Sequence, residues 1–253
     1  MNHETSKNCI SYEVWGKYAL FTDPLTRAGG EKCSYHIPTY EAIKGITESI
    51  YWKPSFTWIV DKVRIMNPIR TEAKNMKPIN IDGIYPSRRN PSKKKEKPYN
   101  TLATYTYLAD VRYQVLAHFE WNPHRDDLKD DRNEGKHWDI AKRMLRKGGR
   151  RDIFLGTREC QGYVQPCEFG SGGRHHQQSG ELSYGLMFHG FDYPDTTGKN
   201  ELHARFWHGK VNSESIIEYP RPEAKSLVRR FIREMSPNPP KSVGLNEPEH
   251  KLA

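Results

Sequence analysis

The stretch Val111-Arg-Tyr-Gln-Val-Leu-Ala-His-Phe-Glu-Trp121 decides the fold. Apolar or aromatic side chains stand at every second position from Val111 to Trp121, and the positions between them are mostly polar. Because the side chains of a strand alternate between its two faces, this pattern predicts a half-buried β-strand. Residues 101–108 also have strand character, and Ala109-Asp110 between the two runs predicts the turn of a hairpin. The chain therefore centres on antiparallel strands.

Further strands and a helix are predicted on either side of this stretch. Residues 11–22 and 56–66 have strand character on its N-terminal side. Between them a helix opens at Pro38, carries isoleucines at helical spacing and is stopped by Pro54. On the C-terminal side, residues 152–165 return to strand character in two short runs.

A second helix is predicted to start within Asp131-Arg-Asn-Glu-Gly-Lys-His-Trp138. Asn133 or Asp131 can cap it, an apolar stripe runs from Trp138 to Leu145, and two glycines follow. The order along the chain is then strand, helix, strand, strand, helix, strand. This is the split βαβ, ferredoxin-like (RRM-like) plan of an α+β protein.

The domain organisation follows from these segments. Residues 1–165 are expected to form the ferredoxin-like domain, with a basic, proline-bearing insertion at 82–99. Residues 166–236 are expected to form a smaller antiparallel β-rich domain. It should end in a helix over 222–235, where apolar residues recur at helical spacing. Residues 237–253 are expected to be a disordered tail.

The charge balance points to nucleic acid. The 253 residues carry 40 Lys and Arg, a formal net charge of +9 and a pI of about 9.3. Such a balance fits a nucleic acid or an acidic membrane surface. No apolar stretch approaches the length that spans a membrane, and the first residues lack the pattern of a secretion signal. We therefore expect a cytoplasmic protein that binds nucleic acid and no membrane.

The four cysteines form no CxxC pair, which favours reduced structural thiols. A zinc site built from Cys160, Cys167, His175 and His176 is the alternative. Its cysteine spacing is wider than usual, and its histidines stand in a glycine-rich segment. The sequence therefore predicts neither a metal site nor a cofactor.

Three residues are candidates for the chemistry of RNA cleavage. Metal-free cleavage needs an activated 2′-hydroxyl, a proton for the leaving 5′-oxygen and stabilisation of the charge on phosphorus. Lys136 and His137 at a helix N-terminus can supply the last two. Tyr51, at the end of the first helix, is the best candidate for the remaining role. Taken alone, however, a Lys-His pair at a helix start is more often an ordinary solvated end, and Tyr51 a packing residue.

The division of roles among the three stays open. The positive helix end and Lys136 both favour a neutral His137 in the free protein, whereas a bound phosphate favours the cation. Tyrosine ionises near pH ~10, so Tyr51 acts either as a base helped by Lys136 or as an orienter of the 2′-hydroxyl. His137 is a proton donor or a positioner, and Lys136 is a phosphate clamp.

Other basic and aromatic residues fit RNA binding. Cations suit phosphates, glycines allow a close backbone approach, and aromatic rings can stack on unpaired bases. The candidates are Arg27, Lys32, Tyr35, Trp52, Arg146, Lys147, Arg150 and Arg151.

Several long runs are similar to those of one known family, the CRISPR-associated Cas-five proteins, d variant, of subtype I-C (RAMP superfamily). The runs are Tyr18–Lys32, Ser34–Tyr40, Lys44–Ile46, Glu48–Pro54, Asp131–His137, Gly149–Tyr163 and Phe169–Gly172. The resemblance extends from about residue 11 to 235. The resemblance implies that the catalytic tyrosine, lysine and histidine of the family correspond to Tyr51, Lys136 and His137. The 82–99 insertion and the long C-terminal tail depart from the family pattern.

The resemblance implies a metal-independent endoribonuclease that cuts the repeat hairpin of precursor CRISPR RNA and leaves a 2′,3′-cyclic phosphate. It also implies that the protein stays on the 5′ handle and joins the backbone and large subunits of the interference complex, with double-stranded DNA as a further, non-specific partner. Related variants are non-catalytic, so the alternative is an assembly subunit that caps the 5′ end of the guide without cutting.

Overall fold

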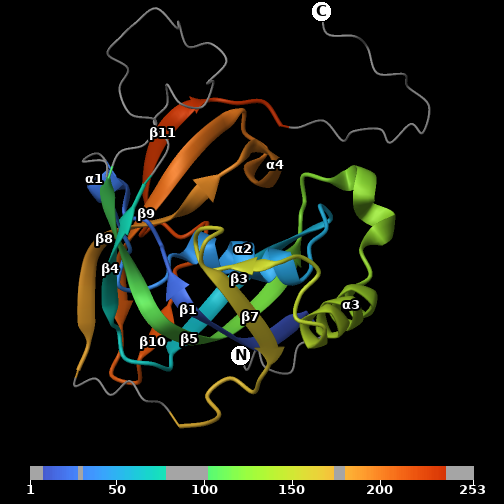
Figure 1. Ribbon diagram of the computed structural model, residues 1–253. Coiled ribbons are helices and arrows are strands. Elements are labelled where there is room, and N and C mark those ends of the chain that lie inside the picture. The colour runs from blue at the N-terminus through green and yellow to red at the C-terminus, as the bar shows by residue number, and fades with distance from the viewer. Residues whose placement is uncertain (1–7, 28–30, 78–101, 174–179, 238–253) are drawn as a thin grey trace, which may run out of the picture.

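One long strand, β5, organises the protein. The computed structural model describes residues 8–27, 31–77, 102–173 and 180–237 (Figure 1). Its N-terminal elements are β1 (Cys9–Ala19), α1 (Pro24–Arg27), β2 (Lys32–Cys33), α2 (Tyr40–Ile50), β3 (Phe56–Ile65), β4 (Thr71–Met76) and β5 (Ala103–Trp121). After β5 come the 3₁₀ helix η4 (Asp126–Asp131), α3 (Glu134–Arg146), β6 (Ile153–Phe154), β7 (Gln161–Pro166), β8 (Leu182–Asp192), α4 (Pro194–Thr197), β9 (Glu201–Val211), β10 (Ile216–Glu218) and β11 (Val228–Glu234).

The predicted hairpin at Ala109-Asp110 is wrong, because β5 runs straight through these residues. β1 pairs with β5 from Cys9 opposite His118 to Ala19 opposite Leu108 in one unbroken register. Asp110 has a positive φ of 52°. Tight two-residue hairpin turns of type I′ need positive φ at both central residues, and Ala109 does not have one. A single left-handed residue therefore leaves the strand direction unchanged.

The main sheet has the strand order β10-β3-β5-β1-β7-β6, and its neighbours along this path are antiparallel. β4 and the short β2 pair with the first half of β5, β2 in the parallel sense. Both long helices contact strands of this sheet and each other, α2 against β3 and α3 against β7 and β1. The architecture is α+β, as predicted, with mostly antiparallel strands.

The two helices begin and end where the sequence predicts. Thr39 caps α2 by accepting a hydrogen bond from the backbone N–H of Ala42 at 3.3 Å. Asn133 rather than Asp131 caps α3, accepting from the N–H of Lys136 at 3.0 Å. Gly148 follows α3 with a positive φ of 84°, a conformation that glycine adopts at low cost. The caps fix Tyr51 and His137 at the ends of α2 and α3 that the site requires.

The predicted helix over 222–235 is wrong. Residues 228–234 form β11, which pairs antiparallel with β9 in a three-stranded sheet of order β11-β9-β8. Phe231 is 58 % exposed, so the apolar stripe does not pack as a helix face would. The Arg229 guanidinium donates to the carbonyls of Pro222 and Ala224, which a helix would use for its own backbone bonds. Tertiary pairing has overridden the helical spacing.

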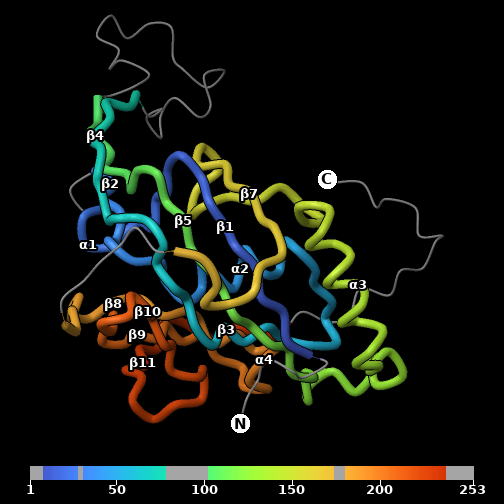
Figure 2. Tube along the Cα trace, turned by 90° about the horizontal axis from the view of Figure 1, so that it is seen from below, coloured from blue at the N-terminus to red at the C-terminus, as the bar shows by residue number. Residues whose placement is uncertain are grey.

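The two sheets share one apolar core. Met187 and Trp207 of the second sheet belong to the same buried cluster as Tyr12 and Val115 of the main sheet. β10 leaves the C-terminal region and extends the main sheet beside β3. Figure 2 shows β8, β9 and β11 on one side of the main sheet. The division at residue 165 stays a prediction, and the 82–99 insertion and the 238–253 tail lie outside the described residues.

None of the described helices is long and apolar enough to cross a lipid bilayer. All four cysteines are free thiols. His175 and His176 of the alternative zinc site lie outside the described residues.

Candidate functional site

The fold brings the three predicted catalytic residues together, although 85 positions separate Tyr51 from Lys136 in the sequence. Tyr51 is the C-cap of α2, and its backbone N–H donates to the carbonyl of Thr47. Its hydroxyl lies 2.8 Å from Nδ1 of His137, in the first turn of α3. The indole N–H of Trp58 donates to the Tyr51 carbonyl at 2.7 Å and fixes this end of the helix.

The second ring nitrogen of His137 identifies the tautomer. Nε2 lies 2.7 Å from the backbone carbonyl oxygen of Asp131. A carbonyl oxygen only accepts, so Nε2 carries a hydrogen. In the neutral imidazole Nδ1 is then bare and accepts the hydroxyl hydrogen of Tyr51. The site therefore holds a tyrosine that donates to a histidine base.

Asp131 connects His137 to Lys136. Its carboxylate accepts from the Lys136 ammonium at 2.6 Å, and its other oxygen lies 3.4 Å from Nε2 of His137. The hydroxyl of Ser55 also donates to this carboxylate at 3.4 Å. The Lys136 hydrogen bond, with the charges of Lys136 and Lys53, lowers the pKa of Asp131. Asp131 is therefore an anion at neutral pH.

Aromatic side chains enclose the imidazole. The rings of Phe56, Trp121 and Phe119 have centroids 5.3, 5.7 and 6.5 Å from that of His137. His137 has no exposed surface and Tyr51 is 2 % exposed, whereas the Lys136 side chain is 52 % exposed. In the free protein an incoming phosphate can thus reach Lys136 before it can reach the other two.

Burial and the charge of Asp131 both shift the pKa of Tyr51 upward. Desolvation raises the pKa of Tyr51, the nearby Asp131 carboxylate adds to the rise, and the charge of Arg150 opposes it. The phenol therefore keeps its proton at neutral pH. A free phenolate is not the resting state of this site.

The predicted RNA-binding residues separate into groups. The backbone N–H groups of Arg150 and Arg151 donate to the carbonyl of Ser49, at the end of α2. Trp52, next to Tyr51, is 43 % exposed. These three residues lie beside the cluster of Tyr51, Lys136 and His137. Arg146 and Lys147 lie at the far end of α3 from Lys136.

Arg27, Lys32 and Tyr35 are not brought to the cluster. Figures 1 and 2 both show α1 on the opposite side of the molecule from α3, and Figure 2 shows β2 next to α1. The Lys32 ammonium instead lies 4.9 Å from the centre of the Tyr105 ring. Their role in RNA binding stays a prediction, and it would concern a part of the RNA remote from Lys136.

Sequence reasoning missed Asp131 as a partner of the catalytic residues and considered it only as a helix cap. Lys53 and the enclosing Phe56 were also missed. The acid five positions before Lys136 in Asp131-Arg-Asn-Glu-Gly-Lys136 was the available signal for the ion pair. No sequence signal was available for the enclosure of His137 by Phe56 and Phe119, because this enclosure depends on which strands face the helices.

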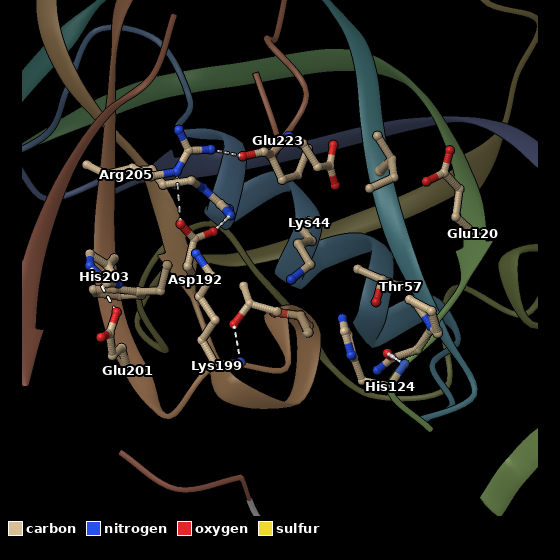
Figure 3. Close-up of a pocket in the computed structure, with 18 of the residues that line it drawn as sticks. Lys44, Thr57, Glu120, His124, Asp192, Lys199, Glu201, His203, Arg205 and Glu223 are labelled. Atoms are coloured by element: carbon tan, nitrogen blue, oxygen red, sulfur yellow. Dashed lines mark hydrogen bonds and ion pairs between the residues drawn. The ribbon is translucent and has the colours of Figure 1, made fainter. Parts of the chain in front are cut away.

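A cavity of about 940 Å³ lies elsewhere, between α2 and the second sheet (Figure 3). Its charged side chains largely satisfy one another. Asp192 accepts from both Arg205 and Arg229, and His203 lies 3.7 Å from Glu201. None of Tyr51, Lys136 and His137 lines it. A cavity with such balanced charge offers no preference for a polyanion.

Comparison with known proteins agrees with the resemblance seen in the sequence. The family model Cas5d, described as a CRISPR-associated protein (Cas_Cas5), matches residues 9–217. The chain is 29% identical over 169 residues, 63% of its length and 67% of the relative's, to the "CRISPR pre-crRNA endoribonuclease Cas5d" of Mannheimia succiniciproducens. It is 27% identical over 246 residues, 87% of its length and 95% of the relative's, to the protein of the same name from Thermus thermophilus.

Two solved structures are similar throughout. One, a CRISPR-associated protein, is 32% identical with a TM-score of 0.66, covering 87% of this chain and 96% of that one. The other, a functionally uncharacterized protein from Streptococcus mutans, is 34% identical with a TM-score of 0.65 over the same shares. With a family model that spans most of its length, the chain belongs to the Cas5d family of CRISPR-associated proteins.

Proposed function

We propose that this protein is an endoribonuclease that cleaves precursor CRISPR RNA within the repeat hairpin. The contact that carries the proposal is the 2.8 Å hydrogen bond between the Tyr51 hydroxyl and Nδ1 of His137, beside the exposed Lys136. The names of the two curated relatives support the reaction and the substrate. The net charge of +9 supports a polyanionic substrate.

The proposed reaction needs no metal ion. The ribose 2′-oxygen attacks the adjacent phosphorus, the bond from phosphorus to the 5′-oxygen breaks, and a 2′,3′-cyclic phosphate is left. The leaving 5′-oxygen takes its proton from solvent water, which reaches the site at the exposed Lys136. Lys136 is an exposed cation of the site and would hold the phosphate and oppose its growing charge. Its ammonium has three N–H donors, so it can contact the phosphate while it keeps the Asp131 carboxylate.

The tautomer supports a specific path for the proton. As the 2′-hydroxyl loses its proton to the Tyr51 oxygen, the Tyr51 proton passes to Nδ1 of His137. The imidazolium so formed keeps its Nε2–H on the Asp131 carbonyl, with the carboxylate oxygen at 3.4 Å. Because the pKa of Tyr51 is raised, the two transfers must be concerted rather than pass through a free phenolate. Asp131 is then a positioning residue.

The sheet order supports a ferredoxin-like plan for the domain that carries this site. β1, α2, β3, β5, α3 and β7 follow one another along the chain, and their strands lie in the order β3-β5-β1-β7. We also propose that the protein remains on the 5′ handle and serves as a subunit of the interference complex. A non-catalytic subunit that only caps the 5′ end is the second candidate.

Single-turnover cleavage of a labelled repeat RNA in the presence of a chelator separates the two candidates. The enzyme should cut at one position, and a 2′-deoxy sugar at that position should abolish the cut. A protein that binds the repeat tightly but leaves it intact is the capping subunit. Cleavage that persists on the deoxy substrate would refute attack by the 2′-oxygen.

A further inference from the structure

The face of the main sheet that is turned away from α2 and α3 carries a row of planar side chains. In the register of the sheet, Trp15 of β1 lies directly opposite Tyr163 of β7 on one side and Arg112 of β5 on the other. Tyr12 of β1 faces the helices, where its hydroxyl lies 2.7 Å from that of Thr47 in α2. Residues three positions apart on a strand point to opposite faces, so Trp15 lies on the open face.

These side chains are accessible and held in place. Tyr163 is 54 % exposed, the Arg112 side chain is 47 % exposed, and Trp15 is partly buried. The two rings have centroids 6.0 Å apart and planes inclined by 33°. The Arg112 guanidinium donates to both carboxylate oxygens of Glu13, at 2.5 and 3.0 Å. This two-point contact fixes the orientation of the guanidinium plane.

We propose that Tyr163, Trp15 and Arg112 form a stacking platform for the bases of single-stranded RNA. Unpaired bases stack on aromatic rings and on guanidinium planes, and every base offers such a face. This inference rests on the proposed function, and it identifies the occupant as the single-stranded RNA that flanks the repeat hairpin.

The charges around the row favour RNA over an apolar partner. Two acids lie near the row. The carboxylate of Glu13 is paired with Arg112 and accepts from Gln165 at 2.9 Å, and the charge of the exposed Asp110 also acts on Arg112. Lys17 is exposed and shares the face of Trp15, two positions along β1, where it can meet a phosphate. Gln161 and Gln165 flank Tyr163 on its own face and are exposed, so their amides can contact base edges.

The platform is also connected to the candidate catalytic site. Tyr163 lies on β7, which is followed in the sheet only by β6 at the edge. Arg151 stands two residues before β6 and is bound through its N–H to Ser49, at the end of α2 next to Tyr51. An RNA strand that leaves the site between Tyr51 and Lys136 would thus pass Arg151, turn round the sheet edge and reach Tyr163.

The test measures binding of a fluorescent 12-nucleotide oligoadenylate to the full-length protein by anisotropy. Tyr163→Ala should weaken binding about 5- to 100-fold, the range found when one stacked base loses its aromatic partner. Tyr163→Phe keeps the ring and should bind like the wild type. Phe231→Ala removes an aromatic ring that is 58 % exposed on β11 and should also leave binding unchanged. Should the alanine variant fail to fold, Tyr163→Leu keeps an apolar contact without a π-face and replaces it.

Wild-type affinity in the alanine or leucine variant would overturn the platform. So would an equal loss of affinity for a 12-base-pair duplex, whose bases offer no free face. A 5-iodouridine crosslink from a repeat RNA with a single-stranded flank should map to Tyr163 or Trp15. The outcome is separable from the proposed function. Weaker oligoadenylate binding by a protein that never cuts repeat RNA would keep the platform and remove the nuclease.

Discussion

Two fully buried histidines of this protein differ in almost every contact that matters for chemistry. His137 hydrogen-bonds through both ring nitrogens, one to a hydroxyl and one to a carbonyl whose carboxylate is close by. His189, on β8, donates through Nε2 to the carbonyl of Pro220 at 3.0 Å, and its Nδ1 has no hydrogen-bond partner among the described residues. Its ring stacks on Tyr40 with centroids 4.2 Å apart.

The difference shows that partners, and not burial, give a histidine its role. Burial, together with the charge of Arg205, lowers the pKa of His189 to about 3. Nothing around His189 would accept a proton from it or return one. His137 instead lies between a proton donor and an anion, and its neighbour Lys136 reaches solvent. Only the arrangement around His137 allows a histidine to take up a proton during a reaction and release it again.

The most direct test of this comparison is to make the same substitution at both histidines. His137→Gln should lower the single-turnover cleavage rate about 10²- to 10⁴-fold, because glutamine can donate to the Asp131 carbonyl but cannot act as a base. His189→Gln keeps a donor for Pro220 and should leave the rate per folded molecule unchanged. Equal losses in both variants, measured on the same RNA, would contradict the assignment of His137.

Acid should reveal the burial of His189 as a loss of stability. The folded pKa of about 3 lies below the unfolded value of ~6.5, so between these values the unfolded chain binds a proton that the native state refuses. The stability contribution is present above ~6.5 and is lost as the pH falls towards 3, on the order of 5 kcal/mol in total. Urea unfolding at a series of pH values should show this loss in the wild type. A slope that is just as steep in His189→Gln would refute it.

Asp131→Asn tests the second difference between the two histidines, which is the carboxylate that lies beside His137 and not beside His189. The backbone carbonyl remains, so the tautomer of His137 should persist, but the imidazolium loses its anion. Cleavage should fall about 10- to 100-fold, since hydrogen bonds to charged groups contribute about 1.5–3 kcal/mol. Affinity for the RNA should not fall, because Lys136 keeps its charge and the carboxylate that repels the phosphate is removed. Asp130→Asn, one residue away and exposed, is the matched control. Wild-type rates in Asp131→Asn would remove Asp131 from the mechanism.

The smallest expected effect is that of His118, whose contribution to folding stability changes with pH in the opposite direction to that of His189. Burial alone would lower the pKa of His118, but its bonds to Asp61 at 2.8 Å and Glu120 at 3.2 Å raise it overall. Its stability contribution is therefore present below the unfolded value of ~6.5 and lost as the pH rises through the folded one. His118→Gln should abolish this loss, which we expect to be about 1 kcal/mol or less. Parallel pH profiles of unfolding for the variant and the wild type would contradict it.

The sequence predicted what local patterns determine. The alternation from Val111 to Trp121 gave the central strand, and the caps and glycines gave α2 and α3. The helical spacing over 222–235 failed, because both faces of β11 are exposed and pairing with β9 sets its conformation. At the candidate site, Tyr51 and His137 were named from the sequence. The Asp131 contacts were not, because they depend on how the residues before α3 fold back onto it.

The pairing of β10 with β3 has a consequence for how the chain folds. Ile217 lies opposite Val63, and β7 likewise pairs with β1 across about 150 residues. β10 and β7 are synthesised long after the strands they join, so the β3 edge of the main sheet stays unpaired until β10 has been made. Contacts so distant along the chain are costly in loop entropy and form slowly. The β3 edge of the main sheet therefore cannot be covered until residues 216–218 have been synthesised, whatever the order in which β1, β3 and β5 pair.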